Sequence, residues 1–241
     1  ISSGKVVTAK ALTVNSKNIV NEGEITSGKE QTLTTGKITN KGAIQSSGNL
    51  TVKAKDDLIS SGKVVTAKAL TVNSKNIVNE GEITSGKEQT LITGKITNKG
   101  TIQSSGNLTV KAKDDLISSG KVVTAKALTV NSKNIINEGE IASGEAQTLT
   151  TGKITNKGTI QSSDNLTIEA KDNLISSGKI VTAKTLTLNS KNIINEGEIA
   201  SGKEQTLTTG KITNKGAIQS SGNLTVKAKD DLISSGKVVT A

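Results

Sequence analysis

The sequence predicts an all-β fold, a parallel β-helix (solenoid) of about twelve coils of about 19 residues, grouped in a 58-residue super-repeat. The string Ile-Ser-Ser-Gly-Lys begins at Ile1, Ile59, Ile117, Ile175 and Ile233, always at the same interval. Apolar and polar residues alternate within each unit, which is the period of a strand. Hydrophobic residues make up only 32% of the chain and none is aromatic, so any core must be thin.

The 58-residue period divides the chain into four full copies and the start of a fifth. The copies cover 1–58, 59–116, 117–174 and 175–232, and the partial copy covers 233–241. We therefore expect a single continuous β-helical segment over 1–241, and we interpret it as a fragment of a larger protein because it begins inside a repeat. The alternative is a disordered low-complexity spacer, but such a spacer would not keep its apolar alternation in register.

Each copy contains three related units, which in the first copy are Ile1–Asn18, Ile19–Lys37 and Ile38–Leu58. Each unit has an initial Ile, a Gly, a second aliphatic residue and a Leu that opens a strand. Alignment on these features predicts the equivalent sets Ile1/Ile19/Ile38, Gly4/Gly23/Gly42, Val6/Ile25/Ile44 and Leu12/Leu33/Leu50.

Equivalent residues of successive coils are expected to stack about 4.8 Å apart, which makes twelve coils a rod of about 60 Å. Inward Asn and Ser side chains would then form ladders that hydrogen-bond along the axis, and the glycines would occupy bends too tight for a Cβ. Gly23→Val should therefore cost several times more stability than Lys29→Glu. The predicted structural ladder consists of Ile19, Asn21, Gly23, Ile25, Leu33, Ile38, Asn40, Gly42, Ile44, Leu50 and Val52.

Differences between the copies support this division into interior and exterior. Positions assigned to the interior exchange aliphatic residues only: Val6 becomes Ile180, Val20 becomes Ile136, and Val14 becomes Leu188. Positions assigned to the exterior reverse charge: Lys29 becomes Glu145, and Lys53 becomes Glu169. A packed interior tolerates volume-neutral exchanges, whereas a solvated face tolerates changes of charge.

The chain uses only twelve residue types and lacks Cys, His, Met, Pro, Arg and all aromatic residues. This composition excludes disulfides, Cys/His zinc sites and His-dependent nucleophilic catalysis. It also excludes aromatic stacking platforms for single-stranded nucleic acid. We predict no catalytic, cofactor-binding or metal-ligating residue, and a protein that is not an enzyme. No apolar run reaches the ~18 residues of a membrane span.

The net charge of +10 is dilute when it is divided among the copies. Lys minus Asp and Glu gives +3, +3, 0 and +3 for the four copies and +1 for the tail. All basic residues are Lys, which lacks the planar fork that favours reading of bases and phosphates. We expect no nucleic-acid partner and a solvated lysine exterior. Contact with heparin-like glycans is the alternative.

Two exposed patterns could carry chemistry. The pairs Glu22/Glu24 and Asp56/Asp57 could hold Ca²⁺ or act in acid–base catalysis, but their copies lie three coils, about 14 Å, apart. An outward file of Thr13, Thr34, Thr51, Thr71 and Thr109 invites comparison with ice-binding solenoids, although Ile92 interrupts it. β-propensity alone explains Thr on an exposed strand.

The units have a specific frame, I-x-N-x-G-x-I-x-S…G-N-L-T-V, which spans Ile38 to Val52 in the first copy. This frame resembles the haemagglutinin repeat of filamentous haemagglutinins and contact-dependent growth inhibition exoproteins. The resemblance implies a right-handed parallel β-helix shaft, exported through an outer-membrane pore partner by two-partner secretion. It also implies a location at the surface of a Gram-negative bacterium.

In that family the shaft serves adhesion or carries a C-terminal toxin to a neighbouring cell, with a receptor or glycan as possible partner. The family's N-terminal secretion domain and its Val-Glu-Asn-Asn boundary are absent from this sequence. The resemblance therefore leaves both roles open. The remaining alternatives are a glycan- or heparin-binding adhesin segment, a polysaccharide-active β-helix enzyme and an ice-binding solenoid.

Overall fold

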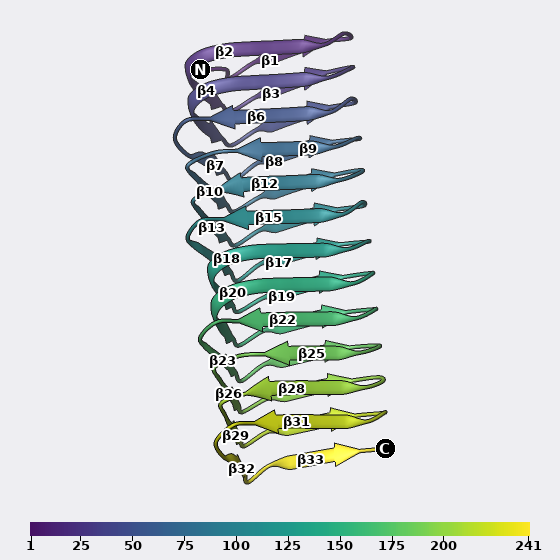
Figure 1. Ribbon diagram of the computed structural model, residues 1–241. Helices are drawn as coiled ribbons and strands as arrows, with labels where there is room; N and C mark the ends of the chain where they lie inside the picture. The colour runs from purple at the N-terminus through teal and green to yellow at the C-terminus, as the bar shows by residue number, and fades with distance from the viewer.

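The computed structural model describes residues 1–241 as 33 strands wound into one stack of coils, without a helix. The two termini lie at opposite ends of the stack (Figure 1). The all-β, parallel β-solenoid predicted from the sequence is thereby confirmed. At about 4.8 Å per coil, the 13 strands of one sheet stack over about 60 Å.

The strands form two parallel sheets that enclose the interior. The 13-stranded sheet consists of β1 (Lys5–Thr8), β3 (Glu24–Ser27), β5 (Ala43–Ser46), β8 (Lys63–Thr66), β11 (Glu82–Ser85), β14 (Thr101–Ser104), β17 (Lys121–Thr124), β19 (Glu140–Ser143), β21 (Thr159–Ser162), β24 (Lys179–Thr182), β27 (Glu198–Ser201), β30 (Ala217–Ser220) and β33 (Lys237–Thr240).

The 20-stranded sheet bends once, so that most coils contribute two short strands to it. It consists of β2 (Leu12–Asn21), β4 (Gln31–Asn40), β6 (Leu50–Ala54), β7 (Leu58–Ser60), β9 (Leu70–Asn73), β10 (Asn76–Asn79), β12 (Gln89–Thr93), β13 (Lys95–Asn98), β15 (Leu108–Ala112), β16 (Asp115–Ser118), β18 (Leu128–Asn137), β20 (Gln147–Asn156), β22 (Leu166–Ala170), β23 (Asn173–Ser176), β25 (Leu186–Asn189), β26 (Asn192–Asn195), β28 (Gln205–Thr209), β29 (Lys211–Asn214), β31 (Leu224–Ala228) and β32 (Leu232–Ser234).

The strand register divides each copy into two 19-residue coils and one 20-residue coil. Glu24 pairs with Ala43, Ala43 with Lys63, and Lys63 with Glu82. Of the three units drawn from the sequence in each copy, the first is therefore one residue too short and the third one residue too long.

The additional residue of the longer coil lies at the bend of the 20-stranded sheet. Ala54 pairs with Thr35 and Leu58 pairs with Ile38, so the step from one coil to the next grows by one residue between Ala54 and Leu58. The bend absorbs this residue outside the paired strands, and the ladder of hydrogen bonds continues on both sides of it.

Inward side chains form a core one layer thick that runs the length of the rod. It contains 38 buried aliphatic residues in one cluster. Of the aliphatic ladder residues predicted from the sequence, Leu33, Ile38, Ile44, Leu50 and Val52 are fully buried. Ile19 and Ile25, in the coils nearest the N-terminus, are 6% and 4% exposed. Burial of these columns is the main source of stability, since the hydrophobic effect scales with the apolar area removed from water.

Two equivalences drawn from the sequence are wrong. The first concerns Leu33, which pairs with Val14 and Val52, while it is Gln31 that pairs with Leu12 and Leu50. The alignment of the three units was therefore displaced by two residues at Leu33. A displacement of two residues still predicts an inward side chain, because strands alternate with period 2.

The second error concerns Ile at the start of each copy. Leu58, not Ile59, pairs with Ile38, while Ile59 pairs with Thr39 and Val78. Since Val20 also pairs with Thr39, Val20 lies in this half-exposed outward column and not in the interior. Its exchange for Ile in later copies therefore occurs on the outside of the rod.

One corner of the coil is occupied by glycine in every turn. A Cβ on Gly23 would overlap the carbonyl oxygen of Gly4, and a Cβ on Gly42 would overlap that of Gly23. No glycine has a positive φ, so the requirement comes from the neighbouring coil and not from a special bend. This glycine file consists of Gly4, Gly23, Gly42, Gly62, Gly81, Gly100, Gly120, Gly139, Gly158, Gly178, Gly197, Gly216 and Gly236.

Candidate functional site

A buried Asn/Ser ladder runs along the interior beside the glycine file. Asn21 Nδ2 donates to Asn40 Oδ1 at 2.8 Å, and Asn40 Nδ2 donates to Ser60 Oγ at 3.1 Å. The series restarts at Asn79, whose Oδ1 accepts no hydrogen bond. The ladder therefore runs in groups of three coils, one group per 58-residue copy, and its role is to satisfy buried polar atoms.

Serines form a second polar series at the C-terminal ends of the strands of the 13-stranded sheet; a Ser ladder was predicted from the sequence, but its residues were not named. Ser27 and Ser46 are buried, and their hydroxyl oxygens are 3.2 Å apart in a hydrogen bond. Ser46 also donates to the carbonyl oxygen of Lys29 at 2.7 Å. The alternation of Ile25 with Ser27 and of Ile44 with Ser46 places these serines inward, and that parity is the signal that could have found them.

Buried glutamines interrupt the Leu column of the 20-stranded sheet once per copy. Gln31, Gln89, Gln147 and Gln205 are at most 1% exposed, and the Nε2 atom of each has no hydrogen-bond partner. Each lies between leucines of the adjacent coils, as Gln89 lies between Leu70 and Leu108. Because these glutamines recur only every third coil, they cannot form a ladder with one another.

The paired carboxylates face lysines of neighbouring coils. Glu22 lies 2.9 Å from Lys41 Nζ, and Glu24 lies 3.4 Å from Lys5 Nζ. A hydrogen bond from the Thr26 hydroxyl, followed by that from Lys5, lowers the pKa of Glu24 below its usual value. No group of three His, Cys, Asp or Glu residues could hold a metal ion. These carboxylates are therefore arranged for ion pairing between coils.

The aspartate pair at the bend is arranged in a similar way. Asp57 Oδ1 accepts a hydrogen bond from Asn76 Nδ2 of the next coil at 2.9 Å. The equivalent Asp115 accepts one from Asn134 at 2.8 Å. A side chain of the following coil therefore holds the second aspartate of each of these pairs.

The predicted outward threonine file exists and follows the 20-stranded sheet, although one of its predicted members and its predicted interruption were wrong. Thr13 pairs with Thr32, Thr32 with Thr51, and the pairing continues without interruption to Thr225. Thr34 and Ile92 lie in the next outward column, so the predicted interruption was wrong. That neighbouring column mixes Asn, Thr, Lys and Ile, and this unevenness still argues against an ice-binding surface.

A shallow groove of about 610 Å³ follows the bend of the 20-stranded sheet in the third and fourth copies. Three lysines and one glutamate provide its charged groups: Lys171, Lys191, Lys229 and Glu169. Ser190, Thr208 and Thr209 add hydroxyl groups to the same lining. This arrangement can attract an extended anionic or hydroxyl-rich ligand, while it offers no enclosed cavity for a small substrate.

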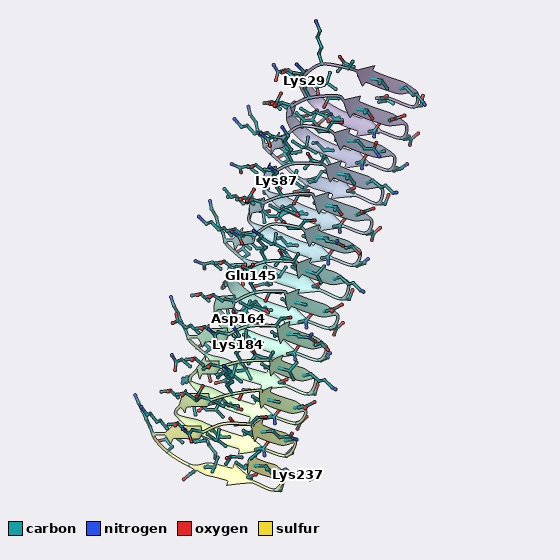
Figure 2. The ribbon with its side chains drawn as sticks, turned by 90° about the vertical axis from the view of Figure 1, so that its right-hand side faces the viewer. Lys29, Lys87, Glu145, Asp164, Lys184 and Lys237 are labelled. Carbon is teal, nitrogen blue, oxygen red and sulfur yellow. The ribbon has the colours of Figure 1, made fainter.

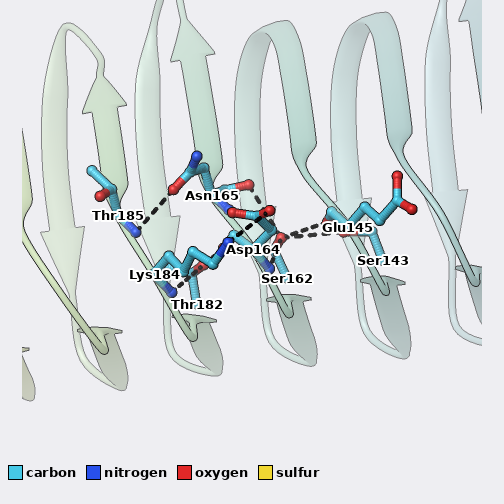
Figure 3. Close-up of polar contacts among 8 residues, drawn as sticks. All are labelled: Ser143, Glu145, Ser162, Asp164, Asn165, Thr182, Lys184 and Thr185. Carbon is cyan, nitrogen blue, oxygen red and sulfur yellow. Dashed lines mark hydrogen bonds and ion pairs between the residues drawn. The ribbon is translucent and has the colours of Figure 1, made fainter.

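The third copy differs from the others at one exposed turn. Glu145 takes the place of Lys29 and Lys87 along one edge of the rod (Figure 2). Asp164 takes the place of glycine, and its carboxylate lies 3.1 Å from Lys184 Nζ (Figure 3). The hydrogen bond from Lys184 lowers the pKa of Asp164 below its usual value, and burial opposes this effect.

Comparison with known proteins gives one result. The haemagglutinin repeat matches residues 1–47, 45–112, 103–174 and 161–240. The chain belongs to the haemagglutinin repeat family. The last three matches follow one another at the interval of the super-repeat, so the family repeat and the super-repeat of this sequence are in step.

Haemagglutinin repeats are structural repeats of adhesin-like proteins and are associated with secreted surface proteins. No curated protein and no solved structure matches the chain. None of its elements is a helix able to cross a membrane.

Proposed function

We propose that this haemagglutinin-repeat chain is a rigid, extended shaft of a large secreted bacterial surface exoprotein. The observation that carries this proposal is the single core of 38 buried residues, which runs without a break from Ile19 to Ile218. Such a core resists bending, since each coil packs directly on the next. In this proposal the shaft serves adhesion or carries a C-terminal toxin to neighbouring cells, after two-partner secretion through an outer-membrane pore of a Gram-negative bacterium.

The shaft is tested by measuring its shape and stiffness. Small-angle X-ray scattering or electron microscopy of the whole chain should show a thin rod of about 60 Å. Chains with one or two 58-residue copies removed should shorten by about 14 Å per copy, because each copy adds three coils. A compact particle, or a length that does not change with copy number, would contradict the proposal.

The role in the whole protein is tested by deleting copies from the full-length exoprotein on the producing cell. If the segment is a spacer, deletion reduces cell–cell adhesion or toxin delivery in proportion to the length lost. It should not matter which copy is removed. A complete loss of function on removal of one particular copy would point instead to a local binding site.

The lysine-lined groove supports a second candidate, direct binding of sulfated glycans. Lys171, Lys191 and Lys229 lie along it, and Glu169 reduces its positive charge. Heparin-affinity chromatography with a salt gradient tests this candidate. Glu169→Lys should increase retention and Lys191→Gln should decrease it, whereas equal retention of both variants and the unaltered chain would rule the candidate out.

A further inference from the structure

Each copy contains one Asn-x-Thr sequence within the frame G-N-L-T or its variant D-N-L-T. The asparagines of these sequences are Asn49, Asn107, Asn165 and Asn223. Every other asparagine of the chain lacks Ser or Thr two residues later. Asn-x-Ser/Thr is the acceptor sequence for N-linked sugars and requires a surface position.

The strand geometry presents this sequence to solvent. Leu50 points into the core and is fully buried, so its neighbours Asn49 and Thr51 share the outward face. Asn49, Asn107, Asn165 and Asn223 are all exposed. Thr51 is half-buried and stands in the outward threonine file, so the acceptor amide and the hydroxyl that defines the sequence lie on the same outer face.

The side-chain amide oxygen of three of these asparagines accepts a hydrogen bond from the next coil. Asn49 Oδ1 accepts the backbone N–H of Ala69 at 3.2 Å, and Asn107 and Asn165 make the same bond with Ala127 and Thr185. The Nδ2 atoms donate no hydrogen bond within the chain. Figure 3 shows the amide oxygen of Asn165 directed at the Thr185 nitrogen, with the amide nitrogen pointing away.

The ladder asparagines provide the contrast. Asn21 and Asn40 are buried, and each uses its Nδ2 atom for hydrogen bonds to side-chain and backbone oxygens. The ladder asparagines are therefore closed to an enzyme. Other asparagines, such as Asn15 and Asn73, are also exposed, but neither has Ser or Thr two residues later, so only Asn49, Asn107, Asn165 and Asn223 combine an exposed amide with the acceptor sequence.

We propose that Asn49, Asn107, Asn165 and Asn223 are N-glycosylation sites that take a sugar from a glycosyl diphosphate donor. The Nδ2 atom attacks C1 of the donated sugar, the bond from C1 to the phosphate oxygen breaks, and the diphosphate leaves while the amide loses one proton. The sites lie three coils apart, so the sugars would form a row with a spacing of about 14 Å. Such a row would cover the threonine face of the shaft with hydrated groups.

Peptide mapping of the exoprotein isolated from the cells that produce it tests the proposal. After denaturation, trypsin should release residues 42–53, 100–111 and 158–171, each with one acceptor sequence; residues 216–227 have the same sequence as 42–53. Each peptide should include a form heavier by one or more sugar residues, and electron-transfer fragmentation should place the sugar on Asn. Complete coverage with unmodified asparagines, or sugar on Thr instead, would overturn the proposal.

Matched variants separate glycosylation from the turn contact made by the same asparagine. Thr51→Ser retains the acceptor sequence and should remain modified at Asn49, whereas Thr51→Val should lose the sugar at that site alone. Asn49→Asp keeps the oxygen that accepts the Ala69 N–H, so the unmodified chain should keep its melting temperature while the site loses its sugar. Persistence of sugar on Asn49 in Thr51→Val would contradict the proposal, even if the variant folds normally.

Discussion

Two corners of the coil use glycine for different reasons. At the first corner, every coil from Gly4 to Gly236 has glycine, and from Gly23 onward a Cβ would overlap the carbonyl oxygen of the glycine one coil earlier. At the second corner, Gly48 and Gly106 face backbone atoms of the previous coil, but Asp164 occupies the same position in the third copy. The difference shows that the first corner is fixed by stacking of backbone on backbone, while the second can shift.

The largest expected effect separates the two corners within one copy. Gly100→Ala should lower the free energy of unfolding by about 4 kcal/mol, because its Cβ meets the carbonyl of Gly81 and neither backbone can move without shifting the sheets. Gly106→Ala should cost about 1 kcal/mol or less, although its Cβ would start 2.7 Å from Glu88 N, since Asp164 demonstrates the required adjustment. Urea denaturation of both variants measures the difference. Equal losses would show that the two corners are equally rigid.

A smaller effect is expected just after the second corner, at the buried glutamine. Gln89→Leu should raise the free energy of unfolding by about 1–3 kcal/mol, because it removes a buried amide nitrogen without a partner. Leu fits the column, since Leu70 and Leu108 already occupy it in the adjacent coils. Thermal unfolding measured by circular dichroism checks this. A lower melting temperature would mean that the amide makes a stabilising interaction that the structure does not contain.

Next in size is a gain at the first corner, where the Asn ladder breaks. In Ser60→Asn, the new side chain should accept a hydrogen bond from Asn40 Nδ2 and donate one to the unpaired Oδ1 of Asn79. The Asn ladders of two adjacent copies would then be continuous. One additional buried hydrogen bond should add about 1 kcal/mol. Hydrogen exchange of the backbone amides around Asn79 should slow. The matched control Ser61→Asn, at an exposed position beside the ladder, should leave the exchange rates of these amides unchanged.

These corners also show what the sequence could and could not predict. The period, the strand alternation and the inward side of Ile25, Ile38 and Leu50 follow from the sequence because alternation reports which face a residue occupies. Alternation does not distinguish a position from the one two residues away, and Gln31 at an inward position concealed the true partner of Leu12. The glycine file was located correctly, but its cause, a carbonyl of another coil, depends on contacts between coils.

The candidate surfaces were predicted less well, for a related reason. Val20 and Ile59 are aliphatic and yet lie on the outside, because a β-branched residue is also favourable on an exposed strand. The threonine file was drawn through Thr34 instead of Thr32 as a direct result of the misplacement of Leu33. Exposed columns show no burial pattern of their own, so their residues are assigned from the register of the core. An error in the core register therefore shifts the assigned exposed columns as well.

The smallest expected effect concerns charge at the second corner. The hydrogen bond and charge of Lys184 depress the pKa of Asp164 in the folded chain, so this ion pair adds stability above the ordinary Asp pKa. That contribution should disappear as the pH falls through the depressed folded pKa. In Lys184→Met the pKa of Asp164, followed by carboxyl carbon chemical shifts, should rise towards its usual value, and the acid dependence of the melting temperature should weaken slightly. The control is Lys126→Met, the same change one copy earlier, where Gly106 stands in place of the aspartate. This variant should leave the acid dependence of the melting temperature unaltered. An equal change in both variants would show that the lysine acts through a group other than Asp164.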